Sequence, residues 1–359
     1  MSFLFLDREE VEALLPMEEC IEVVDEALRI LARGEAVQPL RTVYWMPDRH
    51  GLLAMMPGML GSPSMGSIAG AKILTVVPEN HLHGLESHQG MVVLFEQERG
   101  RPLAILDAAS VTAIRTAAAS AVATRVLARR DAGDLAILGS GVQARTHLDA
   151  MRAVRPLRRV RVWSRRPESA RRFAREESAR TGLAVEVAPT GREAVEGADL
   201  ICAVTAATEA VLFGSSIAPG AHINAVGACT PKARELDAAA VARSLLYTDR
   251  RESLLAEAGD FLLAREEGAV ADDHIRGEIG EVLEGKIPGR RSDDEITLFK
   301  SLGIAVEDLA AGMHVYRKAV AEEEGDASIA CRREGEPRES IEEVRQRLQA
   351  QGKLRQGNP

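Results

Sequence analysis

The feature that most constrains the fold is a glycine-rich loop at residues 139–144, Gly-Ser-Gly-Val-Gln-Ala. It follows an apolar run, Asp134–Leu138, and opens a segment with helical spacing that extends to about Val154. In such a loop the first glycine makes the turn, the second lets a phosphate approach the backbone, and a small third residue lets the helix pack on the strand. The loop therefore predicts a dinucleotide site, in which the pyrophosphate rests on the start of the helix. The weaker alternative is a purely structural strand-to-helix turn. The predicted cofactor contacts in the loop are Gly139, Ser140, Gly141, Val142 and Gln143.

Strand-like and helical segments alternate after residue 130. The strand-like runs are residues 134–138, 160–163, 184–187, 200–204, 222–226 and 245–248. A helical segment at residues 167–181 separates two of them. Strands that alternate with helices form a parallel sheet with both faces covered. The predicted fold class is therefore α/β, with a doubly wound (Rossmann) dinucleotide-binding domain at residues 130–304.

The N-terminal part has a different pattern, typical of an open or meandering sheet with helices on it. An amphipathic helix is predicted from about residue 16 to 32, ending at Gly34, and an Ala-rich helix at residues 109–128. The strand-like runs here are residues 42–45, 52–56, 69–76, 91–96 and 103–106. A further helix from residue 305 to about 321 is expected to return to this part. The predicted organisation is a discontinuous α+β domain for substrate binding and dimerisation (residues 1–129 with 305–325), the dinucleotide-binding domain, and a charged tail at residues 326–359. Residues 339–351 in the tail have the pattern of a solvated helix.

Bulk composition excludes several classes of protein. The 359 residues carry a net charge of -9, which argues against a nucleic-acid partner, because binding to phosphates needs a basic field. No apolar run is long enough to cross a membrane, and the N-terminal residues lack the pattern of a secretion signal. The four cysteines are far apart and have no CxxC spacing, so neither disulfides nor a metal site is predicted. We expect a cytoplasmic protein that binds no metal.

The end of the second predicted strand bears on the choice of cofactor. NAD-binding domains of this kind place a carboxylate there, about twenty residues past the loop, to bind the ribose 2′-hydroxyl. This chain has Ser164, Arg165 and Arg166 instead. A hydroxyl and two guanidinium groups suit a 2′-phosphate, so NADP(H) is favoured and NAD(H) remains possible. The alternative is that both arginines are simply solvated in a locally basic stretch.

The chain resembles the ornithine cyclodeaminase/mu-crystallin family over roughly residues 5–322. The matching segments run in the family's order: residues 71–75, 78–80 with 84–85, 101–104, 112–118, 139–144, 219–227, 234–237 and 297–305. The resemblance implies that Arg41, Lys72 and Arg115 hold the carboxylate of a small imino or amino acid over a nicotinamide. We call these three the clamp residues and expect them to be the catalytic ones. Without the resemblance, Lys72 could equally be an edge-strand lysine and Arg41 a solvated loop arginine, whereas Arg115 interrupts an Ala-rich helix.

The resemblance also assigns a set of further contacts. Glu257 and Leu302 are expected on the substrate side, although Glu257 could also be a solvated helix residue. His88 could exchange a proton or be a hydrogen-bonded structural histidine. The expected further cofactor contacts are Ser87, His88, Thr116, Val204, Thr205, Ala206, Val226, Gly227, Cys229, Lys232 and Ser301.

Two departures from the cyclodeaminase pattern decide the expected chemistry. Cys229 stands where a cyclodeaminase has a proton-relaying Asp, and Ala54 stands where it has a Glu. A thiol is a poor substitute for a carboxylate at neutral pH. The mu-crystallin branch has a small neutral residue at the Cys229 position, and the chain also shares its segments at residues 204–209 and 212–214.

We therefore expect an NAD(P)H-dependent reductase that acts on a small cyclic imino acid, of the ketimine or Δ1-pyrroline-2-carboxylate type. Three alternatives remain open: an ammonia-releasing ornithine or lysine cyclodeaminase with catalytic NAD, an alanine or opine-type dehydrogenase, and a ligand-binding protein without turnover. The resemblance also implies a homodimer formed through the first domain, with strands joining across the interface.

Overall fold

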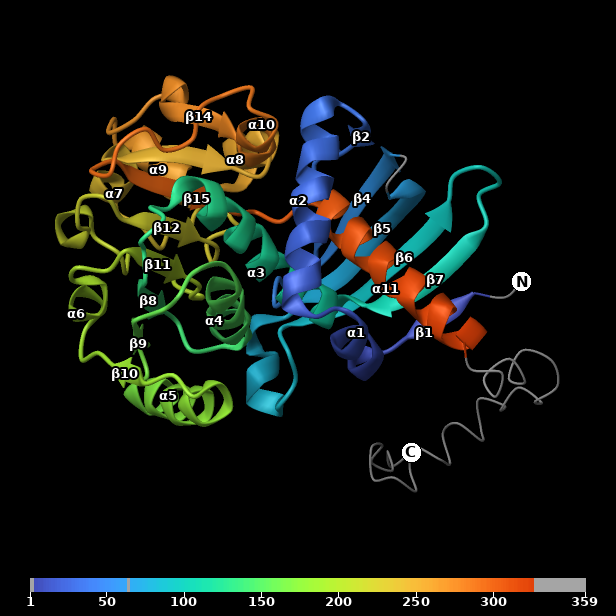
Figure 1. Ribbon diagram of the computed structural model, residues 1–359, viewed down its shortest axis with the longest axis horizontal. Coiled ribbons are helices and arrows are strands. Elements are labelled where there is room, and N and C mark those ends of the chain that lie inside the picture. The colour runs from blue at the N-terminus through green and yellow to red at the C-terminus, as the bar shows by residue number, and fades with distance from the viewer. Residues whose placement is uncertain (1–2, 63–64, 326–359) are drawn as a thin grey trace. The chain divides into compact units, whose positions relative to one another are not determined.

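The computed structural model describes residues 3–62 and 65–325 (Figure 1). The described residues up to Tyr316 form one compact unit, and those from Arg317 onward belong to a second. Every described strand lies in the first unit. The predicted tail at residues 326–359, with its predicted helix, lies outside the described residues.

The part of the chain between residues 134 and 300 is built on a parallel sheet, called sheet B here, of eight strands among the described residues. Their order is β10-β9-β8-β11-β12-β15-β13-β14, and every pair of neighbours is parallel. The order reverses between β8 and β11, which is the switch point where doubly wound sheets bind ligands. The strands are β8 (Asp134–Leu138), β9 (Arg159–Trp163), β10 (Val185–Val187), β11 (Leu200–Ala203), β12 (His222–Ala225), β13 (Ser244–Thr248), β14 (Ile275–Glu278) and β15 (Ile296–Lys300).

Both faces of sheet B are covered, because successive side chains of a strand point to opposite faces. Ala136 and Leu138 of β8 pack with residues of α6 (Gly191–Val195), α7 (Ala238–Ala242), α8 (Arg251–Glu257) and α9 (Gly259–Glu266) in one apolar cluster. On the other face lie α3 (Ala108–Leu127) and α4 (Val142–Val154). There Asn224 of β12 donates from Nδ2 to Thr124 Oγ1 of α3 at 3.0 Å. The remaining helical segments of this part are α5 (Pro167–Thr181), η2 (Gly214–Ser216), η3 (Asp272–His274) and α10 (Ile279–Leu283). The predicted α/β fold class is thus confirmed.

The other sheet, called sheet A here, is mixed. Among the described residues its order is β1-β7-β6-β5-β4-β2, with β3 also paired to β4. The β1–β7 pair is parallel and the others are antiparallel, so β4 to β7 form the predicted meander. Its strands are β1 (Leu4–Leu6), β2 (Ala36–Val37), β3 (Thr42–Trp45), β4 (Leu52–Ser62), β5 (Gly66–Val76), β6 (His88–Glu96) and β7 (Pro102–Asp107). The η1 segment (Pro78–His83) joins β5 to β6.

Helices cover one face of sheet A, where Figure 1 shows α2 (Met17–Arg33) and the part of α11 (Ala305–Gly325) that belongs to the first unit lying across β4 to β7. The start of α11 packs closely on this face, because side-chain atoms of Ala305 and Leu309 lie within 3.3 Å of a Cβ built on Gly58. A Cβ on Gly70 would come within 2.7 Å of Leu309. Helix α1 (Arg8–Leu14) comes before α2 in the chain. Asp7 caps its N-terminus by accepting a hydrogen bond from the N–H of Glu10.

The connection from β15 to α11 is what positions the site. Strand β15 lies between β12 and β13, in the interior of sheet B. The chain leaves its carboxyl end at residues 301–304 and enters α11 on sheet A. Residues from both sheets therefore meet at this junction.

The predicted helices match the structure closely. The helix expected to end at Gly34 does so, with Gly34 in the left-handed region at φ 80°. Strands β1, β2, β14 and β15 were not predicted. β1, β2 and β14 are short, and no predicted helix directly precedes β15. No helix of the described residues is long and apolar enough to span a membrane.

Candidate active site

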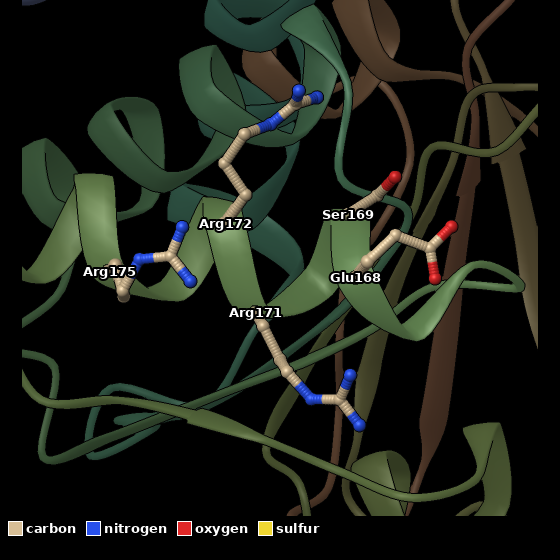
Figure 2. Close-up of a pocket in the computed structure, with 5 residues that line it drawn as sticks. All are labelled: Glu168, Ser169, Arg171, Arg172 and Arg175. Carbon is tan, nitrogen blue, oxygen red and sulfur yellow. The ribbon is translucent and has the colours of Figure 1, made fainter.

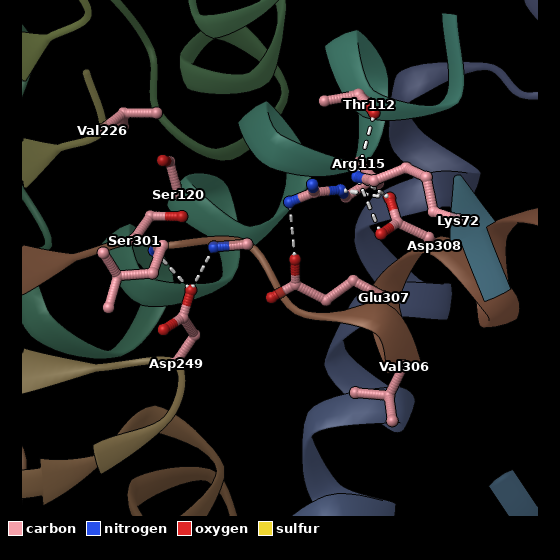
Figure 3. Close-up of polar contacts among 12 residues, drawn as sticks. Lys72, Thr112, Arg115, Ser120, Val226, Asp249, Ser301, Val306, Glu307 and Asp308 are labelled. Atoms are coloured by element: carbon pink, nitrogen blue, oxygen red, sulfur yellow. Dashed lines mark hydrogen bonds and ion pairs between the residues drawn. The ribbon is translucent and has the colours of Figure 1, made fainter. Parts of the chain in front are cut away.

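Lys72 and Arg115 meet at one carboxylate (Figure 3). Lys72 comes from β5, an inner strand, and is 2% exposed; Arg115 comes from α3 and is 3% exposed. The Lys72 ammonium lies 2.8 Å from Asp308 and donates to Thr112 Oγ1 at 3.1 Å. Arg115 Nε donates to Asp308 Oδ1 at 2.7 Å, and Nη1 donates to Glu307 Oε2 at 2.9 Å. The interpretation of Lys72 as an edge-strand lysine is therefore wrong.

Burial shifts the pKa values in this group. Desolvation, helped by the charge of Arg115, lowers the pKa of Lys72 to about 8. Desolvation raises the pKa of Glu307 to about 8, against the attraction of Arg115. Burial also opposes ionisation of Asp308, but Arg115 and Lys72 outweigh it and lower its pKa. Lys72 can therefore exchange a proton near neutral pH, as an acid or base in catalysis must.

Arg41, in the loop before β3, is the third clamp residue. Its Nε lies 2.9 Å from Glu257 Oε2, and its Nη2 donates to the carbonyls of Leu302 and Gly303 at 2.7 and 3.0 Å. Neither Arg41 nor Glu257 is a solvated residue, since their side chains are 18% and 15% exposed. Burial raises the pKa of Glu257, although Arg41 opposes the shift.

The turn after β15 brings the two arginines to one place. Asp249 Oδ2 accepts from the N–H groups of Leu302 and Gly303 at 2.6 and 2.7 Å, which fixes the turn (Figure 3). Gly303 has φ 73°, and a Cβ on it would lie 2.5 Å from Arg115 Nη1. Only glycine fits here. Arg41 binds the carbonyl groups of the same turn. Arg115 is therefore connected to Arg41 through this turn and to Lys72 through Asp308.

The glycine-rich loop has the geometry that a dinucleotide needs. Gly139 has φ 124°, and a Cβ on it would lie 2.7 Å from the Val204 carbonyl, so the tight turn requires glycine. A Cβ on Gly141 would meet nothing within 4 Å. Gly141 is the N-cap of α4, and no side chain caps the helix. The buried Gln143 Oε1 has no hydrogen-bond partner among the described residues. The loop therefore fits a pyrophosphate on an uncapped helix start.

Two loops at the carboxyl edge of sheet B are held by Glu235. Its Oε1 accepts from the N–H and the hydroxyl of Thr205 at 2.6 and 2.7 Å, and its Oε2 accepts from Gly227 N at 2.6 Å. Asp260 accepts from Glu235 N at 2.7 Å and lies 3.0 Å from the buried Lys300 ammonium. These contacts fix the segments that contain the predicted cofactor residues Val204, Thr205, Ala206, Val226 and Gly227.

Other predicted cofactor residues follow β12 and β15. The thiol of Cys229 donates to the Val226 carbonyl at 3.2 Å, and burial raises its pKa, so it stays protonated. The hydroxyl of Ser301, at the end of β15, is buried without a hydrogen-bond partner among the described residues. Lys232 is exposed on a turn after Cys229.

The segment of Ser164, Arg165 and Arg166 follows β9 directly, at the carboxyl edge of sheet B. Both arginines are exposed, and their side chains have no ion pair among the described residues. Three more arginines lie on the next helix, α5, around a surface hollow lined by Glu168, Ser169, Arg171, Arg172 and Arg175 (Figure 2). In Figure 2, Arg171 and Arg172 point to opposite sides of α5, so their guanidinium groups do not converge on one ligand.

Ser87, His88 and Thr116 lie near the clamp residues. Ser87 Oγ and His88 Nδ1 are 2.9 Å apart at the start of β6. Desolvation and the charge of Lys72 lower the pKa of His88, so its ring is neutral at pH 7. Thr116 is buried on α3 beside Arg115.

Sequence reasoning missed the carboxylates of this site. Asp249, Glu307 and Asp308 are all buried, and two of them form the first turn of α11. Acidic residues in a first turn are typical of solvated helix starts. The available signal was that residues 309–313, which directly follow this pair in the helix, are all apolar. Among the described residues, no group of three or more His, Cys, Asp or Glu side chains could hold a metal ion.

Comparisons with known proteins agree over nearly the whole described chain. The model of the ornithine cyclodeaminase/mu-crystallin family matches residues 1–323. The chain is similar to ketimine reductase mu-crystallin of Mus musculus, with 40% identity over 316 residues, or 87% of this chain and 96% of that protein.

Two solved structures are similar in fold and sequence. The first is Thermococcus litoralis Delta(1)-pyrroline-2-carboxylate reductase in complex with NADH and L-proline, with a TM-score of 0.86 and 38% identity, over 89% of this chain and 98% of that one. The second is an archaeal alanine dehydrogenase dimer with bound NAD, with a TM-score of 0.84 and 32% identity, over 90% of this chain and 98% of that one.

Proposed function

The chain belongs to the ornithine cyclodeaminase/mu-crystallin family, and from that premise we propose that it is an NAD(P)H-dependent reductase of a small cyclic imino acid. The substrate is of the ketimine or Δ1-pyrroline-2-carboxylate type. The observation that carries the proposal is the joint placement of Arg41, Lys72 and Arg115 around the turn of Leu302 and Gly303. This turn leaves the same carboxyl edge of sheet B as the dinucleotide loop.

The clamp residues suit a ligand with a carboxylate. Carboxylates of the protein occupy Nε and Nη1 of Arg115, while its Nη2 has no hydrogen-bond partner among the described residues. Arg41 contacts Glu257 through Nε and the carbonyls of Leu302 and Gly303 through Nη2, so its Nη1 remains available as a donor. Each arginine thus retains donors whose direction is set by buried contacts, and preorganised donors bind a carboxylate at low entropic cost. Leu302 contributes its backbone, since its side chain packs in the core of sheet B.

The same edge of sheet B is suited to NADP(H). Gly139, Ser140, Gly141, Val142 and Gln143 would hold the pyrophosphate, and Ser164, Arg165 and Arg166 the 2′-phosphate. The segments that directly follow β11, β12 and β15 would hold the nicotinamide half. They include Thr205, Gly227 and Ser301. When bound, the reduced nicotinamide supplies a hydride to the C=N carbon.

Lys72 is the proposed proton donor. As the C=N bond becomes a C–N bond, the imine nitrogen needs a proton. The pKa of Lys72, lowered to about 8 by burial, makes its ammonium a competent acid near neutral pH. Asp308 and Thr112 hold the ammonium in place, so the proton has a fixed direction.

The site does not favour cyclodeamination. That reaction would need a proton relay at Cys229, whose pKa is raised by burial and whose thiol is bound to a backbone carbonyl. A test is to supply Δ1-pyrroline-2-carboxylate and its six-membered homologue with NADPH or NADH, and to follow nicotinamide absorbance. Oxidation of NADPH with cyclic imines supports the proposal. Ammonia release from L-ornithine with catalytic NAD, without net redox, would contradict it.

The proposed assembly is a homodimer through sheet A. The face of this sheet that points away from α2 carries two apolar rows across paired strands: Met55, Ile73 and Met91, and Met59, Ala69 and Phe95. The methionines of these rows and Phe95 are exposed in the single chain. An apolar patch of this kind is a typical protein interface, and a second copy of the chain is the proposed occupant.

A further inference from the structure

The clamp residues belong to a buried group whose charges do not balance. We define the clamp cluster as Arg41, Lys72 and Arg115 with the carboxyl groups that contact them or fix their turn: Asp249, Glu257, Glu307 and Asp308. When all of these are ionised, three positive charges face four negative ones. A substrate carboxylate would add another negative charge to a group that is already negative. Adding an uncompensated charge to a buried site is costly.

Three of the four carboxyl groups are well paired with cations or backbone N–H groups. Asp308 contacts both Lys72 and Arg115. Asp249 accepts from three backbone N–H groups, those of Arg250, Leu302 and Gly303. Glu257 pairs with Arg41 at 2.9 Å and retains some exposure to solvent.

Glu307 is different. Its side chain is fully buried, and its Oε1 has no hydrogen-bond partner among the described residues. Asp308 Oδ2 and Glu257 Oε2 also lack hydrogen bonds within the described part of the chain, but they lie 2.8 Å from the Lys72 ammonium and 2.9 Å from Arg41 Nε. The one cationic partner of Glu307 is Arg115, which it shares with Asp308. A carboxyl group with one oxygen unsolvated and two carboxylates nearby is the member of the cluster that can most easily be neutralised.

We propose that Glu307 is in its acid form whenever the substrate's carboxylate is bound, so that at alkaline pH, where Glu307 of the free site is ionised, the anion enters together with one proton from solvent. Neutral Glu307 then competes less for Arg115, whose Nη1 and Nη2 become available to the incoming carboxylate. Asp308 keeps its charge and keeps Lys72 and Arg115 in position. Glu307 is thus a positioning residue that matches the charge of the site to an anionic ligand.

The surroundings of Glu307 are consistent with this role. Arg115 on α3 favours its anion, while Asp249 after β13 and Asp308 on α11 favour its acid form. Lys72 on β5 forms its ion pair with Asp308 rather than with Glu307. Cys20 on α2 also faces the cluster, and burial raises the pKa of its thiol, so it contributes no charge. The balance of burial and these charges leaves the pKa of Glu307 at about 8.

The test uses the full chain with NADPH and pyrrole-2-carboxylate, a planar anion without a reducible C=N bond. It is run at about pH 9, roughly one unit above the pKa of Glu307, where the carboxyl group of Glu307 is mostly ionised in the free site. Calorimetric titration in buffers of different ionisation enthalpy counts the protons taken up. Because an amide does not bind a proton in this range, Glu307→Gln is expected to take up about one proton fewer than the wild type. Infrared difference spectra should show a new protonated-acid C=O band in the wild type and not in Glu307→Gln.

Glu177→Gln is the matched control, because Glu177 is also a fully buried carboxylate, on α5, paired with Arg145 and Arg180. It should behave as the wild type does. Above pH 8, the affinity of the wild type for pyrrole-2-carboxylate should fall more steeply with pH than that of Glu307→Gln. The difference should be about a factor of ten for each pH unit. Binding to the wild type without the acid band, or equal proton uptake in the wild type and Glu307→Gln, would overturn this inference alone. It rests on the proposed function for the class of ligand, so absence of any binding would overturn both.

Discussion

At the scale of single residues, the site is defined by how cations and carboxylates share partners. Asp308 is the common partner of Lys72 and Arg115, so neither cation is free to turn toward solvent. Thr112 adds a neutral acceptor to Lys72, one helical turn before Arg115 on α3. The result is a lysine with a lowered pKa and an arginine with fixed donors. Each can be tested by one substitution.

Replacing Lys72 with Met should remove the proton donor while keeping a long buried side chain. We expect kcat/KM for the cyclic imine to fall by about 10²–10⁴, the usual contribution of a general acid. In the wild type, kcat/KM should fall above about pH 8, because the acid form of Lys72 is lost as pH rises through its pKa. Lys286→Met, at an exposed lysine, is the control. Turnover of Lys72→Met at the wild-type rate would exclude Lys72 as the donor.

Replacing Arg165 or Arg166 with Ala tests the choice of cofactor. A charge-assisted hydrogen bond to phosphate is worth about 1.5–3 kcal/mol, so KM for NADPH should rise about tenfold or more. KM for NADH should stay the same, because NADH has no 2′-phosphate. Arg171→Ala, at an exposed arginine of α5, should leave both values unchanged. An equal rise for both cofactors, or no rise, would contradict the assignment.

At the scale of elements, the junction between β15 and α11 organises the site. It comes out of the interior of sheet B and enters the helix that packs on sheet A. Its backbone N–H groups bind Asp249, and its carbonyls bind Arg41. Gly303 lets the chain turn close against Nη1 and Nη2 of the Arg115 guanidinium. A small change in this turn should therefore affect binding of the carboxylate.

Gly303→Ala puts this to a test. A Cβ 2.5 Å from Arg115 Nη1 would displace the guanidinium, and a displacement of about 1 Å can cost on the order of 10²-fold in rate. We expect KM for the imine to rise and kcat/KM to fall by about that factor. Gly268→Ala is the control, since Gly268 has a similar φ of 76° with nothing within 4 Å of a Cβ. It should lower stability by about 1–2 kcal/mol through backbone strain and leave the kinetics unchanged. Equal kinetic effects of the two variants would argue against a role for the junction.

At the scale of the whole molecule, the two faces of sheet A differ. The inward residues of β4, such as Ala54, Met56 and Leu60, are buried beneath helices, whereas Met55 and Met59 between them are exposed. This alternation places an apolar surface opposite the helix-covered face. The proposed dimer covers that surface.

Met91→Glu should therefore weaken the assembly. Burial of a carboxylate in the centre of an apolar interface costs several kcal/mol, so the variant should sediment as a monomer at concentrations where the wild type is a dimer. Analytical ultracentrifugation measures this. Val187→Glu, at an exposed apolar strand residue of sheet B, should leave the dimer intact. A Met91→Glu variant that remains a dimer would place the interface elsewhere.

Local sequence patterns were enough to predict the longer elements and a cofactor loop. The period of apolar residues predicted most strands and the longer helices, because it reflects burial on one or both faces. The glycines at 139 and 141 predicted a phosphate site because they follow an apolar strand and open a helix. Arg115 was noticeable because a charge in an Ala-rich helix has no place on a regular solvated face. Resemblance to a family supplied Arg41 and Lys72, which local pattern left ambiguous.

Only the tertiary structure decided which carboxylates complete the site. Glu307 and Asp308 have the sequence pattern of an ordinary acidic helix start, and Asp249 that of a polar residue after a strand. They become part of the site because β15 inserts between β12 and β13 and directs α11 onto sheet A. Strand order depends on pairing between residues far apart in the chain, which no local pattern encodes. Burial then follows from that packing, and with it the pKa values of about 8 for Lys72 and Glu307.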